Sequence, residues 1–434
     1  MNNTLRLKGK FGRGNAQHPG PPSLPANAVV TTNQIQDRLD DLHQIIAYWK
    51  TQPTFIDPLV EVRYKTIVAK SNRVKRLLSS HDKSANDSIV GAAFGTNQNG
   101  KPCHVITYYV KMGTIESTLK DLEIAKEILI HHGDSIGNKE LTSITHDGLA
   151  KIDAHMGLSK TSFAQIIRDA YYVERFTVKT YADPQQEHAL VSIYDTGRNG
   201  LQTVALLNKL GVNVLGANLL DTTTINMTPN QYRKLTETAP YLVAMSLKDM
   251  LELKFEPDSN QIDDQFVPSI PTPANEPTIG VIDTCFDEKN AYFSKWVEYH
   301  NELDSQIDIN PKDLVHGTEV TSLIVDGPTL NPALDDGCGR FRVRHFAVAK
   351  SGNNSSFTIM KTIRNIVSNN PDIKVWNLSL GSRLESPKNT ISPEAAMLDK
   401  LQNEYDIVFV VAGTNKTQKD SRIKPKRIGA PADS

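Results

Sequence analysis

The sequence predicts an α/β protein whose C-terminal third is a doubly wound parallel sheet. Two observations lead to this prediction. From residue 278 onward, strand-like and helix-like segments alternate, and the first and last of these strands are continuous apolar runs. Such runs are expected where helices cover both faces of a parallel sheet. An α+β accessory module and a smaller ferredoxin-like module are predicted ahead of this domain.

Length and composition narrow the class of protein. With 434 residues, 39% hydrophobic and 22% charged, the chain is expected to be globular and to form several domains. Its net charge of −1 gives no electrostatic basis for a nucleic-acid or membrane partner. The polar N-terminus lacks the apolar segment of a signal peptide, so we expect a cytoplasmic protein. Three distant cysteines fit neither a disulfide framework nor a metal site, and no cofactor is predicted.

The first part of the chain divides into two predicted regions. Residues 1–50 read as an extended arm, rich in Gly and Pro, that leads into a helix with apolar residues every three or four positions. Residues 51–180 are predicted to form the α+β accessory domain. Its expected strands are 59–64, 89–94 and 104–110, and its expected helices are 114–131 and a segment near 161–172.

Residues 186–250 show the element order β-α-β-β-α-β, which is that of a small ferredoxin-like module. The expected strands are 189–194, 212–215, 223–227 and 241–245, and the expected helices are 203–210 and about 228–237. A linker over 251–277, rich in Pro, Asp and Asn, follows. The fold is a common one, so an ordinary accessory domain remains an alternative.

Residues 278–434 contain the alternating segments. Strands are predicted at 279–283, 343–348, 373–380 and 407–412, and helices at 316–325, 356–367 and 393–405. In such a sheet, ligands bind beyond the carboxyl ends of the strands.

Three polar residues are expected at that carboxyl edge. Asp283 ends the first strand, His316 begins a helix, and Asn415 follows the last strand. A carboxylate can hold an imidazole in one tautomer while the imidazole takes a proton from a nucleophile. An amide can stabilise the oxyanion that forms. Asp283, His316 and Asn415 are therefore the predicted catalytic residues.

The segments around these residues resemble the subtilase (peptidase S8) family of serine proteases over about 278–434. Asp283-Thr284 resembles the family's Asp-Thr/Ser-Gly strand end, and His316-Gly317-Thr318 resembles its His-Gly-Thr helix start. Asn377–Ser382 resembles the segment that pairs with substrate, and Val411–Asn415 resembles the oxyanion segment. Two departures are Cys285, where the family has Gly, and Thr414, which is inserted before Asn415.

The resemblance implies a serine endopeptidase that cleaves peptide bonds in protein substrates. It implies that Ser379, Leu380 and Gly381 bind the substrate strand, and that residues 186–250 act as a propeptide. The family's nucleophilic serine lies farther beyond the oxyanion residue than Ser434, so we expect an incomplete subtilisin-like domain and an inactive 434-residue chain. Cytoplasmic bacterial subtilases with long N-terminal regions are similar, and some of them imply an AAA-type ATPase as partner.

Two other functions remain open from the sequence. A subtilase-like module without a nucleophile would bind peptides or proteins without cutting them. A nucleotide-binding α/β enzyme ranks last, because neither a Gly-rich phosphate loop nor a Walker loop follows any strand.

Overall fold

The computed structural model describes residues 22–147, 157–179, 189–248, 270–330, 332–334, 337–350, 355–381, 391–413 and 429–433. The chain forms two compact units, Met1–Lys179 and Thr180–Ser434.

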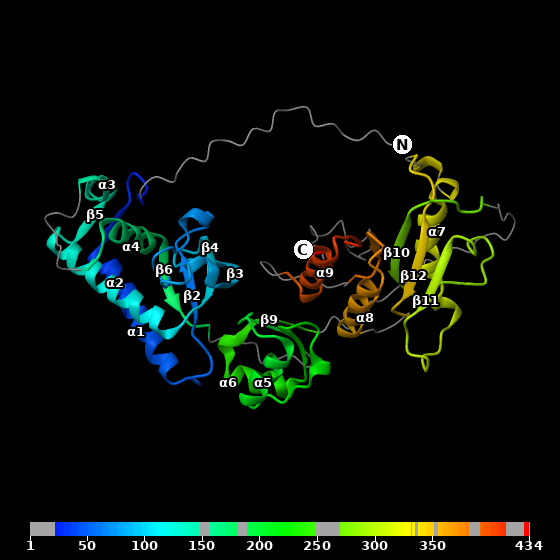
Figure 1. Cartoon of the computed structure of the whole chain (residues 1–434), viewed down its shortest axis with the longest axis horizontal. Helices are drawn as coiled ribbons and strands as arrows, with labels where there is room; N and C mark the ends of the chain where they lie inside the picture. The colour runs from blue at the N-terminus through cyan, green and yellow to red at the C-terminus, as the bar shows by residue number, and fades with distance from the viewer. Residues whose placement is uncertain are drawn as a thin grey trace. The chain divides into compact units, whose positions relative to one another are not determined.

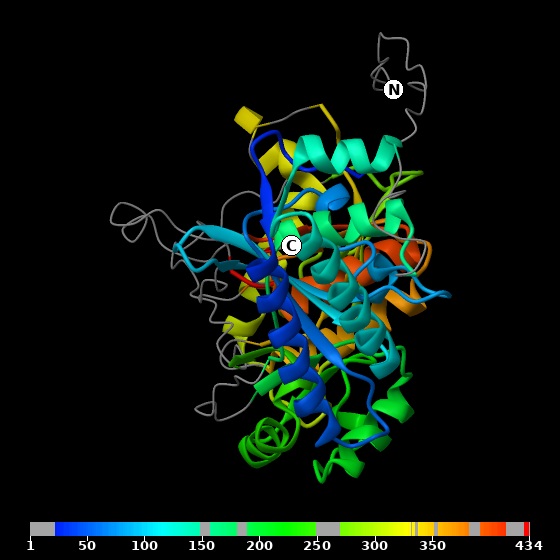
Figure 2. The same cartoon turned by 90° about the vertical axis from the view of Figure 1, so that its left-hand side faces the viewer.

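The N-terminal unit is built on a four-stranded antiparallel sheet with the strand order β3-β4-β2-β6. Its strands are β2 (Leu59–Tyr64), β3 (Ile89–Thr96), β4 (Pro102–Tyr109) and β6 (Val173–Thr177). Its helices are α1 (Thr32–Lys50), α2 (Met112–His131), α3 (Asn138–Asp147) and α4 (Lys160–Tyr172). Helix α1 packs on α2 and β6, and Figure 2 shows it in blue on the side that faces the viewer. Two short strands, β1 (Val29–Thr31) and β5 (Ser135–Gly137), pair with each other and contact helices of this unit.

Residues 189–248 form a three-stranded antiparallel sheet in the order β8-β7-β9. Its elements are β7 (Ala189–Ile193), α5 (Gly200–Lys209), β8 (Thr224–Met227), α6 (Pro229–Thr238) and β9 (Val243–Lys248). The strand predicted at 212–215 is absent from this described segment. Here the N–H groups of Val214 and Leu215 donate to the side-chain amides of Asn208 and Asn218, at 3.1 and 3.0 Å, instead of to a neighbouring strand. The four-stranded ferredoxin-like sheet is therefore not formed by the described residues.

The C-terminal domain contains a five-stranded parallel sheet with the order β11-β12-β10-β13-β14. Its strands are β10 (Thr278–Asp283), β11 (Val297–Asn301), β12 (Arg342–Ala347), β13 (Val375–Leu378) and β14 (Val408–Val411). The predicted parallel α/β sheet is confirmed, whereas β11 was not predicted. Figure 1 shows β10, β12 and β11 next to each other with α7 (Val315–Leu330) along them.

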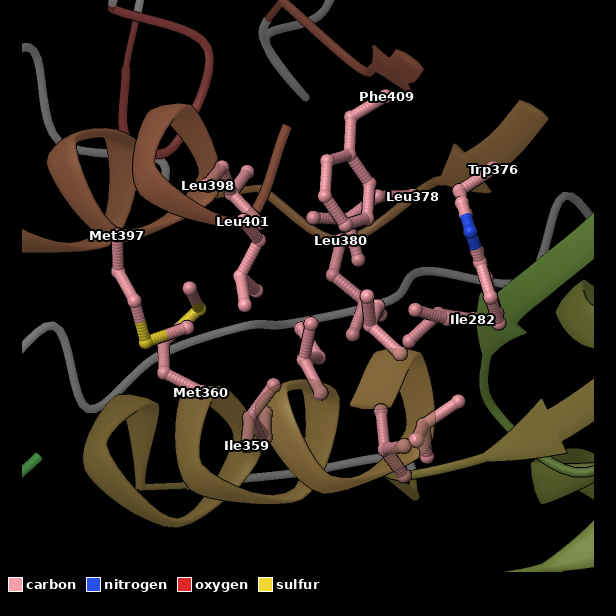
Figure 3. Close-up of a cluster of buried hydrophobic side chains, with 14 of the residues drawn as sticks. Ile282, Ile359, Met360, Trp376, Leu378, Leu380, Met397, Leu398, Leu401 and Phe409 are labelled. Carbon is pink, nitrogen blue, oxygen red and sulfur yellow. The ribbon is translucent and has the colours of Figure 1, made fainter. Parts of the chain in front are cut away.

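Helices lie on both faces of this sheet. Successive residues of a strand point to opposite faces, so neighbouring residues of β10 enter different hydrophobic cores. Val281 belongs to a cluster with Val325 of α7, whereas Ile282 belongs to the core formed with α8 (Ser356–Asn369) and α9 (Pro393–Tyr405). Figure 3 shows Ile282 and Trp376 at one end of this second core. Gly280 makes room for the tryptophan, since a Cβ atom there would overlap the indole ring of Trp376.

The face opposite that second core is less covered at the β14 end of the sheet. Val408 and Val410 alternate with the buried Phe409, and they are 55% and 56% exposed. Val375 of β13 is also exposed.

The segment 189–248 contacts the C-terminal domain through the loop that precedes β8. Leu220 is buried in the core of α8 and α9, and its carbonyl oxygen accepts a hydrogen bond from Nη1 of Arg364 at 3.0 Å. Beside it, Nζ of Lys400 lies 2.7 Å from Oδ2 of Asp221.

Candidate active site

Asp283 lies at the carboxyl end of the central strand β10, and its side chain is fully buried. The backbone N–H of Thr284 donates to Oδ1 of Asp283 at 2.6 Å. A buried carboxylate needs such partners, because the loss of its hydration costs on the order of several kcal/mol. The β10 strand therefore delivers a fixed negative charge to the edge of the sheet.

His316 is the second residue of α7, and its ring reaches Asp283. Its Nδ1 lies 2.7 Å from Oδ1 of Asp283. A carboxylate accepts only, so Nδ1 carries the proton and Nε2 carries the lone pair of the neutral ring. The His316 side chain is 33% exposed, so the structure brings together a buried acid and a partly exposed base.

The surroundings of His316 raise its pKa above the ordinary value of 6.5. Burial acts to lower this pKa. The hydrogen bond and charge of Asp283 outweigh that effect, and the charge of Glu319 adds to theirs. Because Asp283 stabilises the imidazolium, it favours the form that arises when His316 takes a proton.

Close packing at Gly317 sets the position of His316. A Cβ atom on residue 317 would lie 2.6 Å from the carbonyl oxygens of both Thr284 and Cys285. In addition, the N–H of Gly317 donates to Oγ1 of Thr284 at 3.0 Å. Only glycine allows the first turn of α7 to come this near to the end of β10.

The predicted substrate-binding residues follow β13. Nδ2 of Asn377 donates to Oγ of Ser379 at 2.8 Å, and Ser379 is half-buried. The side chain of Leu380 is 2% exposed and belongs to the core, so this residue has only its backbone to offer a substrate. Gly381 packs toward the carbonyl oxygen of Ala412, which a Cβ atom there would approach to 3.4 Å.

Asn415 lies outside the described residues, so its position relative to His316 stays a prediction. Strand β14 does end at the same edge as β10. Leu378 pairs with both Ile282 and Val411, and the N–H of Ala412 donates to the carbonyl oxygen of Leu378 at 3.1 Å.

The sequence reasoning missed two buried polar residues near this pair. His345 of β12 is fully buried, with Nε2 2.7 Å from the carbonyl oxygen of Thr284. Its Nδ1 lies 2.8 Å from Oγ1 of Thr321 on α7. The local sequence carries no signal for it, because β12 also contains the exposed Arg342 and the half-buried Arg344.

Neither a metal site nor a membrane span is found in the part of the chain that the structure describes. No three His, Cys, Asp or Glu side chains gather there in a way that would hold a metal ion. None of the described helices has the length and apolar character needed to cross a bilayer.

The fold and the pair define a class of protein: a parallel α/β domain with a buried carboxylate and an imidazole at the carboxyl edge of its sheet. Residues 274–434 match the model of the subtilase family, Peptidase_S8. This part of the chain belongs to the subtilase family, which is a family of serine proteases.

The solved structures include a similar protein, the epidermin leader peptide processing serine protease from Staphylococcus aureus. It is 16% identical, with a TM-score of 0.31, over 56% of this chain. The chain covers 65% of that protein, which is just under two thirds of its length. A comparison with curated proteins found no match.

Proposed function

We propose that residues 274–434 provide the acid–base part of a subtilisin-like endopeptidase. The observation that carries this proposal is the 2.7 Å hydrogen bond between Nδ1 of His316 and the fully buried Asp283. In the proposed reaction, Nε2 of His316 takes the proton of a serine hydroxyl as that oxygen attacks a peptide carbonyl. His316 then gives the proton to the leaving amine, and Asp283 stabilises the imidazolium between the two transfers.

The remaining parts of the mechanism rest on the family resemblance. The nucleophilic serine is proposed to lie beyond residue 434. Asn415 is proposed to donate to the oxyanion, an interaction whose loss typically lowers kcat by about 10² to 10³. The backbone of Ser379–Gly381 is proposed to pair with the substrate as an added strand. A cytoplasmic location and an AAA-type ATPase partner are further proposals from the same resemblance.

We also propose that residues 186–250 act as a propeptide. The contact of Leu220 with the core of α8 and α9 supports this role, together with the ion pair between Asp221 and Lys400. A family propeptide also passes its C-terminal segment through the substrate cleft. Most of the corresponding segment, about 246–253, lies outside the described residues.

Labelling with a serine-directed fluorophosphonate tests the catalytic proposal. A chain extended past residue 434 is expected to be labelled at one serine, and the 434-residue chain is expected not to be labelled. His316→Gln should abolish labelling in the extended chain. His300→Gln is the matched control, because His300 lies on β11 and bonds the exposed Glu298.

Two outcomes would contradict the proposal. Stoichiometric labelling of a serine within residues 1–434 would place the nucleophile elsewhere. Labelling that persists in His316→Gln would remove His316 from the general-base role. If neither chain is labelled, the non-catalytic peptide-binding alternative is favoured.

A further inference from the structure

His345 lies directly behind the Asp283–His316 pair and is not part of the proposed chemistry. It sits on β12, whose residues pair in parallel with those of β10, so that His345 is opposite Val281. Its ring is fully buried between the end of β10 and helix α7. A buried histidine with both ring nitrogens occupied needs an explanation, because an apolar residue would fill the same space at lower cost.

The partners of His345 define its tautomer. The carbonyl oxygen of Thr284 can only accept, so Nε2 of His345 carries the proton and donates to it at 2.7 Å. Nδ1 then accepts from the hydroxyl of Thr321 at 2.8 Å. Burial lowers the pKa of His345 although the Thr284 carbonyl and the charge of Asp283 act in the opposite direction, so the neutral ring is favoured.

Thr284 is the residue through which His345 reaches the pair. The N–H of Thr284 donates to Asp283, and its hydroxyl accepts from the N–H of Gly317, the neighbour of His316. Its remaining polar group is the carbonyl, which His345 holds. Thr321 lies on the same helix as His316, so the two hydrogen bonds of His345 connect the end of β10 to α7.

We propose that His345 is a positioning residue, which keeps Asp283 and His316 at hydrogen-bond distance by fixing Thr284 against α7. Its importance for catalysis rests on the proposed function, whereas its effect on the geometry of the pair does not. His345 touches neither the pair's hydrogen bond nor the expected substrate, so it acts only through Thr284 and Thr321.

A purely structural role is the competing explanation. The ring centroid of His345 lies 5.7 Å from that of Phe286 and 5.6 Å from that of Tyr299, so the ring also packs in an aromatic cluster. If packing were its whole contribution, an apolar substitute would change stability and leave the Asp283–His316 pair as it is.

Four variants of the full 434-residue chain separate these roles. His345→Leu removes the donor to Thr284 and the acceptor for Thr321. His345→Gln restores an amide donor and acceptor at a similar reach. Thr321→Val removes only the hydroxyl, and it serves if the leucine variant does not fold. Val343→Ala truncates a buried residue of the same strand that belongs to a hydrophobic cluster. It is the control for a general loss of stability that leaves His345 and its partners intact.

The readout is the titration of His316, which is monitored by NMR on protein with labelled histidine. The His316 resonance is identified among those of the 12 histidines by its loss in His316→Gln. The facing charges are Asp283 and Glu319, and all four variants keep both. In His345→Leu, we expect the pKa of His316 to fall toward 6.5, its ordinary value, and the downfield resonance of its Nδ1 proton to be lost. His345→Gln should restore both signals, Thr321→Val should shift them in the same direction as the leucine variant, and Val343→Ala should leave them unchanged.

An unchanged pKa and Nδ1 proton of His316 in folded His345→Leu, or in Thr321→Val if the former does not fold, would overturn the proposal. A shift of equal size in Val343→Ala would also overturn it, because general destabilisation would then explain the change. None of these measurements needs a nucleophile. A failure of fluorophosphonate labelling would therefore reject the proposed function separately from the role of His345.

Discussion

Gly317→Ala is expected to separate the first turn of α7 from the end of β10. The new Cβ atom would lie 2.6 Å from the carbonyl oxygens of Thr284 and Cys285, whereas ordinary contact begins at 3.4 Å. Both neighbours are backbone atoms, which do not rotate away as a flexible side chain would. The shortfall of 0.8 Å must therefore appear as a displacement of α7.

This displacement would lengthen the hydrogen bond between His316 and Asp283, whereas its effect on the free energy of unfolding is the sum of two opposing contributions. The 2.7 Å hydrogen bond between His316 and Asp283, lengthened by most of 0.8 Å, would exceed the usual limit of about 3.2 Å. Overpacking costs about 1–3 kcal/mol, while alanine is favoured over glycine in a helix by about 1 kcal/mol. The free energy of unfolding is then expected to decrease by about 0–2 kcal/mol. Stability alone is a weak test, and the pKa of His316 is the sharper one.

The assay combines denaturant unfolding with the NMR titration of His316. Gly327→Ala is the control, since Gly327 follows the break in α7 at Asp326, away from the end of β10, and a Cβ atom there meets nothing within 4 Å. We expect the pKa of His316 to fall toward 6.5 in Gly317→Ala and to stay raised in Gly327→Ala. If both variants keep the raised pKa and gain similar stability, the close contact at Gly317 does not position His316.

Three further outcomes are expected. In an active extended chain, Asp283→Asn should lower kcat by about 10⁴ without unfolding the domain, because the imidazole would adopt the wrong tautomer; activity within tenfold of the wild type would argue against this role. Leu220→Ala should destabilise the contact of segment 189–248 with α8 and α9 by about 2–5 kcal/mol, and Lys400→Ala by less than about 1 kcal/mol because that side chain is 55% exposed; hydrogen exchange of α9 should rank the two in this order. Burial lowers the pKa of His345, so the folded state binds fewer protons there and loses stability as pH falls below 6.5. His316, with its raised pKa, contributes stability that is present below pH 6.5 and lost as pH rises through its folded value. The wild type and His345→Gln share the His316 contribution, so the unfolding free energy of the wild type should fall relative to that of His345→Gln as the pH falls below 6.5; a difference that does not change with pH would argue against a depressed pKa of His345.

Continuous apolar runs predicted two strands of the parallel sheet, of which β10 is largely buried and β14 exposes Val408 and Val410 on one face. The continuous apolar runs around Val281 and Phe409 led to β10 and β14, and the acid that ends the first of these runs led to Asp283. Such runs are informative because a parallel strand inside two helical layers has no solvent face to mark with polar residues. The helix start at His316 was also recognised, since the residues after it are helical in pattern.

The edge strand β11 could not be recognised in the same way. Its sequence, Val-Glu-Tyr-His-Asn, mixes charged and aromatic residues, and no residue of it is fully buried. It pairs only with β12 among the described strands, and Glu298 faces Arg344 of that neighbour at 2.9 Å. Pairing with a strand over 40 residues away, rather than local pattern, produces this element.

The false strand at 212–215 shows the converse error. Val212 and Val214 are buried and alternate with polar or exposed residues, which is the pattern of a half-buried strand. Alternating burial does not determine where the backbone N–H groups bond. In this loop two side-chain amides accept those hydrogen bonds, and no ladder forms.

The position of His345 depends on contacts that are remote in sequence. Its partners, Thr284 and Thr321, lie 61 and 24 residues away. Nothing in the local sequence distinguishes a histidine that holds a backbone carbonyl from one that faces solvent. The proposed catalytic pair, Asp283 and His316, was therefore predictable from strand and helix ends, whereas the hydrogen bonds of His345 required the three-dimensional structure.

The alternation of exposed Val408 and Val410 along β14 also bears on how the protein behaves in concentrated solution. Among the strands that the structure describes, β14 is at the end of the sheet, so it presents backbone donors and acceptors next to an apolar strip. With a net charge of −1, copies of the chain repel each other only weakly near neutral pH. Self-association is therefore expected to grow with protein concentration and to depend little on ionic strength, and a lysine at residue 410 should suppress it.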